Sequence, residues 1–85
     1  MEVEIDGIVI DEPKNPMEYC IYVVRSRQKE YMIVSYHVQA VKDYIFIKVG
    51  QHVHITGEEI SDGIIEEKKS RIIFDLEIKN LKRNN

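Results

Sequence analysis

Apolar and polar residues alternate along several stretches of this chain, and a period of two is typical of β-strands with one buried face. The clearest example is the run QHVHITGEEI, residues 51–60, which follows one glycine and contains another. Successive side chains of a strand point to opposite sides, so this run places Val53 and Ile55 on one side and His52 and His54 on the other. We predict a strand here whose apolar side faces a core.

Four other runs have the composition or the alternation of strands. They are residues 2–10, Tyr19–Arg27, Tyr31–Val38 and Arg71–Leu81. Residues 11–16 are dense in proline, aspartate and asparagine and are predicted to form a loop. The polar residues 28–30 are predicted to form a short turn between the second and third strands.

Three segments are less regular. Residues 39–47, QAVKDYIFI, fit a short helix and an extended crossing equally, and their pattern does not decide between the two. Residues 61–70 are predicted to form a hairpin or a flexible loop around Asp62 and Gly63. Residues 82–85 are expected to be a frayed tail.

The 85 residues are enough for one domain, which we expect to span residues 1–85. Five strands at regular spacing, with at most one short helix or crossing between the third and the fourth, predict an all-β fold that closes into a small barrel. Closure removes the edges that five open strands would expose. A five-stranded Greek-key barrel of this kind is the OB-fold, which binds oligonucleotides or oligosaccharides on its second and third strands.

The formal net charge of −3 is spread unevenly along the chain. Residues 1–13 contain five acidic side chains and no lysine or arginine, whereas residues 14–54 contain six basic side chains and three acidic ones. A strongly basic domain would indicate nucleic-acid binding directly, and this acidic chain is not such a domain. The positive middle segment nevertheless leaves that function open.

The cellular compartment is predicted from two features. No apolar run approaches the roughly 18 residues of a membrane span, and no signal peptide is apparent, so we expect no membrane contact. The single cysteine, Cys20, cannot form an intramolecular disulfide, which fits a reducing cytoplasm. Because Cys20 lies in an apolar run, we expect a buried structural thiol.

His52 and His54 would share one side of their strand, as two ligands of a metal ion would. Zinc requires three or four ligands, and the other candidates, His37 and Cys20, lie in other strands. We therefore expect solvated histidines on a polar face and no metal site. Nothing in the sequence indicates a nucleophile–histidine–acid arrangement or a glycine-rich phosphate loop, so we expect no enzyme activity and no cofactor.

All five tyrosines lie between residues 19 and 44, among arginines and lysines. Proteins that bind single-stranded nucleic acids use flat rings on which bases stack and cations that neutralise phosphates. The candidate binding residues in this segment are Tyr36, Tyr31, Arg25, Arg27 and Lys29. Each ring can instead be structural, because tyrosine is a good strand former. If Arg25 and Arg27 face outward, Tyr22 points inward, whereas a curled strand can bring Tyr22 to the binding face.

The order and spacing of these runs resemble those of the bacterial single-stranded-DNA-binding proteins and the related primosomal replication protein B. The run VGQHVHITGEEI, residues 49–60, resembles the fourth strand of that family. Counting back from Gly50 without a gap, Tyr36 falls where the family has an aromatic residue that stacks on a base. The run YCIYVVRSR, residues 19–27, resembles the second strand of the primosomal protein, and EIDGIVIDEP, residues 4–13, resembles the opening strand.

The resemblance implies a non-catalytic OB domain that binds single-stranded DNA, or RNA, and acts in replication, repair or mobile-element transfer. It also implies a homodimer or a higher homo-oligomer, and replication proteins as partners. In the primosomal protein the basic loop before the fifth strand grips DNA, which implies a DNA contact for Lys68, Lys69 and Arg71 in the predicted hairpin. The chain departs from the family in having no tryptophan and no acidic tail ending in phenylalanine, which places it closer to the tail-less primosomal form.

Two other functions stay open on the sequence alone. The acidic balance and the missing tryptophan favour an OB domain that serves as a protein-interaction or assembly module with little nucleic-acid affinity. A weaker alternative is the binding of an oligosaccharide or a small ligand on the same barrel face. The clustering of tyrosines with basic residues favours single-stranded nucleic acid.

Overall fold

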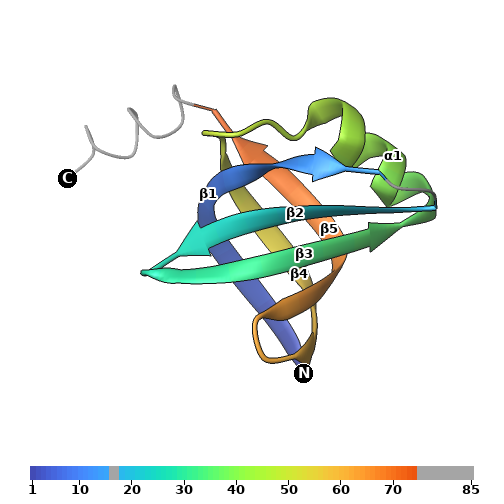
Figure 1. Ribbon diagram of the computed structural model, residues 1–85. Helices are drawn as coiled ribbons and strands as arrows, with labels where there is room; N and C mark the ends of the chain where they lie inside the picture. Colours follow the sequence, from blue (N-terminus) through green and yellow to red (C-terminus); the bar gives the residue numbers. More distant parts are fainter. Residues whose placement is uncertain (16–17, 75–85) are drawn as a thin grey trace.

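The protein consists of five strands and one helix in a computed structural model that describes residues 1–15 and 18–74 (Figure 1). In chain order the elements are β1 (Glu2–Lys14), β2 (Tyr19–Ser26), β3 (Lys29–Tyr36), α1 (His37–Phe46), β4 (His52–Ser61) and β5 (Ile64–Ile73). The segment 39–47, which the sequence left undecided, therefore lies mostly in a helix. No helix among the described residues has the length and apolar character needed to span a membrane.

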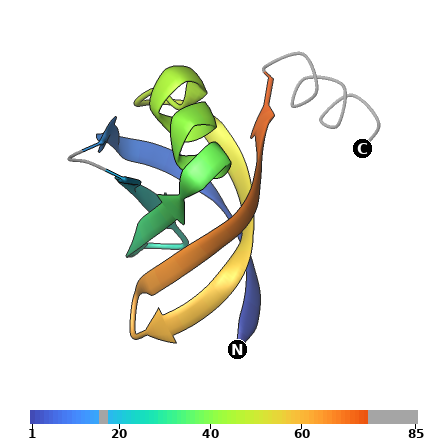
Figure 2. The same ribbon diagram turned by 90° about the vertical axis from the view of Figure 1, so that its right-hand side faces the viewer.

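The strands form a closed barrel in the order β1-β2-β3-β5-β4. All neighbouring strands are antiparallel except β3 and β5, which are parallel and pair Met32 with Ile64, Ile33 with Ile65 and Val34 with Glu66. The helix α1 connects β3 to β4 and lies across one end of the barrel (Figures 1 and 2). This arrangement confirms the predicted five-stranded barrel with a single helix between the third and fourth strands.

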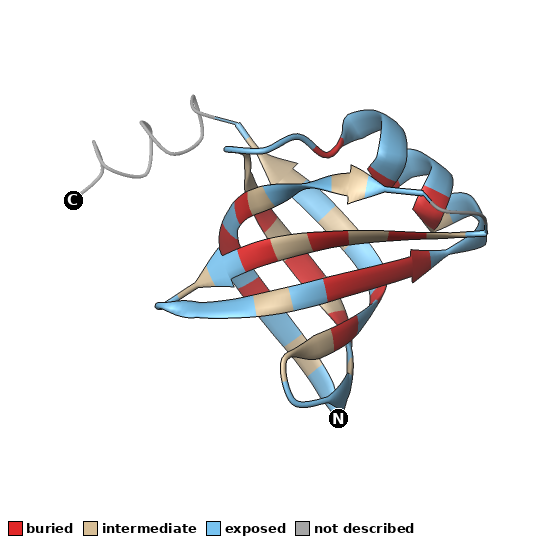
Figure 3. Cartoon of the chain, in the orientation of Figure 1, coloured by how far each residue is buried: buried red, intermediate tan, exposed pale blue. Residues whose placement is uncertain are grey.

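The barrel interior is filled by the inward side chains of every strand, as the alternating colours of Figure 3 show. In β2 these are Cys20, Tyr22 and Val24, each no more than 1% exposed. Cys20 is thus the buried thiol that the sequence predicts, and burial raises its pKa to about 11. Because Tyr22 points inward, Ile21, Val23 and Arg25 point outward, which is the first of the two alternatives that the sequence allowed.

Two strand boundaries differ from the prediction. Strand β1 continues to Lys14, so the loop predicted over residues 11–16 is wrong for its first part. Its pairing with β2 continues through two register shifts, and such irregularities allow a proline to lie within a strand. Strand β3 ends at Tyr36, and His37 and Val38, which were predicted to continue it, begin the helix instead.

The fifth strand begins earlier than predicted. Strand β5 starts at Ile64, directly after the Asp62-Gly63 turn, whereas the sequence predicted Arg71 as its first residue. Of the two alternatives for residues 61–70 the hairpin is confirmed, because β4 and β5 pair on either side of the Asp62-Gly63 turn. The charged stretch before Arg71 is part of the barrel wall and not a flexible loop. The rest of the predicted strand, residues 75–81, and the predicted tail, residues 82–85, lie outside the described residues.

Two glycines lie where strands approach too closely for a side chain. A Cβ atom on Gly7 would overlap the carbonyl oxygen of Arg25 and would lie 2.6 Å from a methyl carbon of Val24. A Cβ atom on Gly57 would overlap the carbonyl oxygen of Glu66. Both glycines are buried, and their lack of a side chain lets β1 and β4 curl tightly enough to close the barrel.

A buried pair of carboxyl groups joins α1 to the barrel wall. Asp43 of α1 is 1% exposed and Glu67 of β5 is 6% exposed. The Tyr22 hydroxyl donates a hydrogen bond to Glu67, while the Gln39 amide and the Ser70 hydroxyl donate to Asp43 Oδ1 over 2.9 Å and 3.3 Å. Each carboxyl group also has a second buried oxygen, Asp43 Oδ2 and Glu67 Oε2. No other group among the described residues donates a hydrogen bond to either of these two oxygens.

Burial and mutual repulsion favour one bound proton on this pair of carboxyl groups. Burial, and then the hydrogen bond and the negative charge of Asp43, raise the pKa of Glu67 to about 9. Glu67 is therefore protonated at neutral pH and can donate to Asp43, which avoids two adjacent buried charges. The same environment, with burial as the largest cause, raises the pKa of Tyr22 and keeps its hydroxyl a donor.

This pair makes stability depend on pH. The pKa of Glu67 is about 9 in the folded protein against an ordinary value of 4.5, so the folded state binds the proton more tightly between these two pH values. The contribution of Glu67 to the free energy of unfolding is complete below pH 4.5 and is lost as the pH rises toward 9, by up to about 1.4 kcal/mol per pH unit.

We predict that Glu67→Gln, which imitates the protonated carboxyl, flattens the fall in stability between pH 6 and pH 9. Urea unfolding at several pH values measures the effect. Glu66→Gln is the matched control, because Glu66 precedes Glu67 in β5 but is exposed, and it should keep the wild-type pH dependence. Equal slopes for wild type and Glu67→Gln would show that the pair does not share a proton.

Candidate nucleic-acid interface

The outward side chains of β2 and β3 form one continuous surface, which we call the β2–β3 face. The two strands pair in register, so each outward residue of β2 lies beside one of β3. The four cross-strand pairs of this face are Tyr19 with Tyr36, Ile21 with Val34, Val23 with Met32, and Arg25 with Glu30.

Aromatic rings gather at the helix end of the β2–β3 face. The ring centroids of Tyr19 and Tyr36 are 6.2 Å apart with an interplanar angle of 46°, and the ring of His37 lies 6.5 Å from that of Tyr36. Tyr36 is 43% exposed, so one side of its ring is open to solvent. An exposed ring of this kind can stack on a nucleic-acid base.

The middle of the face is aliphatic. Ile21 and Val23 are half-buried, Met32 is 42% exposed and Val34 is nearly covered by its neighbours. This strip has no charged side chain, and it can pack against a base or against an apolar group of another protein.

Basic side chains gather at the hairpin end of the face, and two of them are already paired. Arg25 forms an ion pair with Glu30 at 2.9 Å, and Lys29 forms one with Asp62 at 2.9 Å. The pair with Asp62 raises the pKa of Lys29, chiefly through its hydrogen bond. Both pairs are exposed to solvent, where such pairs contribute little to stability, so a phosphate can replace the carboxylate.

Arg27 lies at the tip of the β2–β3 hairpin. Arg27 and Gln28 both adopt a positive φ, 51° and 69°, as in the two-residue turns that match the twist of a hairpin. The side chain of Arg27 is exposed and forms no ion pair with any residue of the described ranges 1–15 and 18–74. It is the cation of this face that is most available to a phosphate.

Tyr31 does not belong to the β2–β3 face. It lies opposite the buried Val24 and packs, half-buried, against the core. The ammonium group of Lys29 lies 5.1 Å from its ring centroid. The structure therefore separates Tyr31 from Tyr36, although the sequence grouped both as candidates for stacking.

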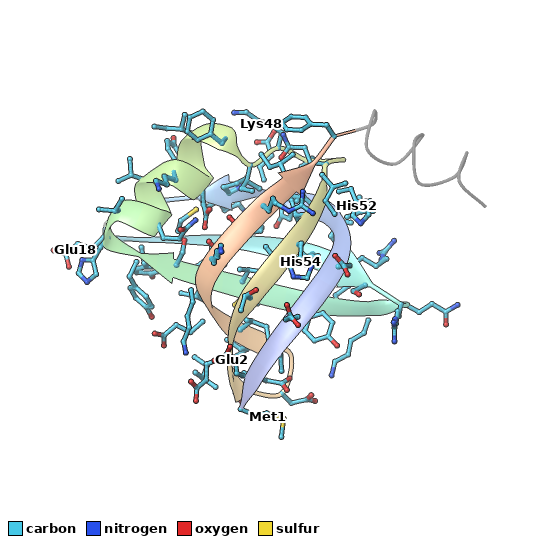
Figure 4. All side chains as sticks on the ribbon, turned by 180° about the vertical axis from the view of Figure 1, so that it is seen from behind. Met1, Glu2, Glu18, Lys48, His52 and His54 are labelled. Atoms are coloured by element: carbon cyan, nitrogen blue, oxygen red, sulfur yellow. The ribbon has the colours of Figure 1, made fainter. Side chains whose placement is uncertain are left out.

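The three basic residues of the predicted hairpin lie in β5 and not in a loop. Lys69 pairs with Thr56 and Arg71 pairs with His54 on the outer side of β4 and β5, which Figure 4 shows from behind. Lys68 forms an ion pair with Glu2 at 3.4 Å. These residues lie on another side of the barrel from Tyr36, so the structure divides the predicted site into two parts.

The outer side of β1 and β4 is acidic. His54 lies between two carboxylates of β1, with Nδ1 2.7 Å from Asp6 and Nε2 3.2 Å from Glu4 (Figure 4). The hydrogen bond with Asp6 first, and then that with Glu4, raise the pKa of His54. Among the described residues no group of three or more histidine, cysteine, aspartate or glutamate side chains is placed to hold a metal ion.

Sequence reasoning missed two aromatic members of the site, Tyr19 and His37. The parity of β2 could have indicated Tyr19, because it is an odd number of residues from the buried Tyr22 and so faces outward. His37 could not have been found in this way, because the sequence predicted it within the third strand, whereas it begins α1.

Comparisons with known proteins find similarity in structure but not in sequence. No protein-family model and no curated protein matches the sequence. The structure is similar to the mitochondrial single-stranded DNA binding protein Rim1 from S. cerevisiae, with a TM-score of 0.74 and 14% identity over 86% of this chain and 93% of that one. It is also similar to the small single-stranded DNA-binding protein from Streptomyces coelicolor, with a TM-score of 0.70 and 12% identity over 87% and 93%.

A third similar structure is part of a larger protein. It is TiaS in a complex with a tRNA, AMPCPP and agmatine, with a TM-score of 0.75 and 13% identity over 86% of this chain but 19% of that one. Identities this low establish a common fold and nothing finer, so the resemblance to the primosomal protein stays a prediction. The chain has the OB-fold, in the form found in single-stranded DNA-binding proteins.

Proposed function

We propose that this chain is a non-catalytic OB domain that binds single-stranded DNA on its β2–β3 face and acts in replication, repair or mobile-element transfer. The observation that carries the proposal is the pairing of the half-buried Tyr19 with the exposed Tyr36 at one end of that face, with Arg25 and Arg27 at the other. Rings for bases and cations for phosphates are the two parts that a sequence-tolerant single-strand binder needs.

The size of the face supports this interpretation. Tyr36 lies six residues along β3 from Glu30, which at about 3.3 Å per residue gives a path of about 20 Å. That length fits the smaller sites of OB domains, which hold about four or more nucleotides. The strand would run from the tyrosines, over the aliphatic strip, to the hairpin.

Charge predicts weak binding. Glu4 and Asp6 of β1 line the same hollow as Arg27 and would repel a phosphate there. Arg25 and Lys29 must also leave their carboxylate partners before they contact phosphates. Binding is therefore expected to be weak, salt-sensitive and sequence-tolerant.

A protein-interaction module is the second candidate function, and the aliphatic strip favours it. Ile21, Val23 and Met32 give the centre of the β2–β3 face an apolar surface that another protein can cover. Titration with labelled oligo-dT at about 50 mM salt separates the two functions, because phosphate contacts are strong at low salt. Absence of binding under these conditions would favour the interaction module.

We predict that Tyr36→Ala weakens oligo-dT binding by about 1–3 kcal/mol and leaves the salt dependence nearly unchanged, because it removes a stacking ring and no charge. Arg27→Ala should instead lower the slope of log K against log salt by about 0.7, the value for one phosphate contact of a single strand. Fluorescence anisotropy over a salt series measures both quantities.

Tyr44→Ala is the matched control for the ring, since Tyr44 is 53% exposed on α1 and lies outside the β2–β3 face. It should bind oligo-dT as the wild type does. Circular dichroism checks the fold of each variant. If Tyr36→Ala unfolds the domain, or binds as tightly as the control, the stacking role of Tyr36 is refuted.

We propose further that the chain forms a homodimer through the outer side of α1. Val38, Val41 and Ile45, spaced as i, i+3 and i+7, are 69%, 54% and 53% exposed, while Ala40 and Asp43 on the inner side are buried. The outer side of α1 is therefore an exposed apolar stripe, which is typical of a helix side that packs against another surface. A second copy is a suitable partner for the outer side, because an antiparallel helix pair buries the same apolar side of both.

The charges at the two ends of α1 support this arrangement. Glu18 lies beside Val38 and Val41 near the start of the helix, and Lys48 follows its end (Figure 4). An antiparallel pair would bring these opposite charges together across the interface.

We predict that sedimentation at micromolar concentration gives a species of twice the 10.0 kDa chain mass. Val41→Glu should give the 10.0 kDa species with unchanged circular dichroism, because a charge cannot be buried in the apolar interface without cost. Ile60→Glu is the control, since Ile60 is 55% exposed on β4, away from α1, and it should remain dimeric. A wild-type chain that sediments at 10.0 kDa would disprove the dimer.

A further inference from the structure

A groove of about 500 Å³ lies between α1 and the end of β5, away from the β2–β3 face. Its volume is within the range of ligand sites in proteins, about 300–1,000 Å³. The residues that line it fall into apolar, polar and basic groups. They are Phe46, Ile47, Ile72 and Phe74, then Gln39, Asp43 and Ser70, and then Lys42, Lys69 and Arg71.

Two phenylalanine rings from different elements meet at this groove. Phe46 is the last residue of α1 and is 60% exposed, and Phe74 follows β5 and is 65% exposed. A single exposed phenylalanine needs no explanation, but two that line one groove form a surface on which a flat ring can stack. Ile47 and Ile72 add two further apolar side chains to the same lining.

Three cations from two elements border the same groove. Lys42 comes from α1, whereas Lys69 and Arg71 come from β5. Asp43 is the one acidic residue of the lining among the described residues, and it is buried and hydrogen-bonded to Gln39 and Ser70. Among the described residues the lining therefore has three basic side chains against one acidic one, which suits a ligand that carries negative charge.

The chemistry of the lining restricts the class of ligand. Exposed phenylalanines favour a flat aromatic ring, and the three surrounding cations favour an anion attached to that ring. A nucleotide combines a base with a phosphate and so meets both conditions. Gln39 and Ser70 also line the groove, where their amide and hydroxyl groups are hydrogen-bonded to Asp43.

We propose that this groove is a second nucleotide site, in which a base packs against Phe46 and Phe74 and its phosphate lies beside Lys42, Lys69 and Arg71. The inference deepens the proposed function and rests on it, because that function is the reason to expect the nucleotide to belong to a single strand. Lys69 and Arg71 lie on another side of the barrel from Tyr36, and this site would give them a nucleotide that Tyr36 does not contact.

The test compares variants of the two sites in the full chain. Phe46→Ala and Phe74→Ala should each weaken oligo-dT binding about 5- to 150-fold, the loss that one stacking ring carries in other single-strand binders. Lys42→Gln should lower the salt slope by about 0.7. Val49→Ala is the control, because Val49 is 52% exposed near α1 but does not line the groove, and it should bind as the wild type does.

The fold of each variant is checked by circular dichroism and its mass by sedimentation, since both phenylalanines are mostly exposed and their removal should leave the barrel intact. A second arm titrates the wild type with thymidine monophosphate, followed by the NMR signals of the phenylalanine rings. Shifts of these signals that saturate, and that Tyr36→Ala leaves unchanged, would support a site for one nucleotide. Shifts with oligo-dT alone would support a site that needs a continuous strand.

The outcomes separate this inference from the proposed function. If Tyr36→Ala weakens oligo-dT binding while both phenylalanine variants bind as the wild type does, the groove is not a nucleotide site and the β2–β3 face stands. If the phenylalanine variants lose binding and Tyr36→Ala does not, the groove is supported and the β2–β3 face fails. If neither oligo-dT nor thymidine monophosphate shifts the phenylalanine signals, the groove proposal is overturned.

Discussion

The parallel pairing of β3 with β5 is the constraint on which the rest of this structure depends. Three residue pairs close the barrel at this seam, and without them β3 and β5 would each expose an edge. Closure fixes which side chains of every strand point inward, because the side-chain period of a strand is two. It thereby turns Tyr19 and Tyr36 outward together on neighbouring strands and Tyr22 inward to the core.

The helix depends on the same closure. Asp43 can be buried because α1 lies over the open end of the barrel, where Glu67 and its proton are within reach. The docked helix then creates surfaces that the strands alone would not have, namely the groove beside β5 and the exposed apolar side of α1. The acidic side chains of β1 lie next to the β2–β3 hairpin, since Glu4 and Asp6 line one hollow together with Arg27.

The sequence predicted those parts of the fold in which alternation is strict. Val53 and Ile55 alternate with His52 and His54, and the faces of β4 came out as predicted. It failed for β5 because Glu67 is buried as a neutral acid, and because the pairing with β4 shifts register beside Lys68. A run of charged residues with one side turned inward has no signature of a strand, and bulges break the period of two.

The sequence predicted which types of residue form the candidate site better than it predicted how those residues are arranged in space. Tyr31 and Tyr36 are five residues apart, an odd number, so a single strand must place them on opposite faces. The meeting of Tyr19 with Tyr36 depends on a two-residue turn at Arg27-Gln28. The sequence predicted a turn at residues 28–30, but without asparagine or glycine it did not indicate the two turn residues that set the register. Contacts between Phe46 and its groove depend on how α1 docks, which no local pattern encodes.

The most direct test of the central claim, that single-stranded nucleic acid binds the β2–β3 face, is an NMR titration of the ¹⁵N-labelled chain with a short oligo-dT. We expect the largest amide shifts in β2 and β3, around Tyr19, Tyr36 and the Arg27 turn, and we expect them to shrink as salt is raised. Shifts confined to the acidic side of β1 and β4, or no shifts in β2 and β3 at low salt, would contradict the claim.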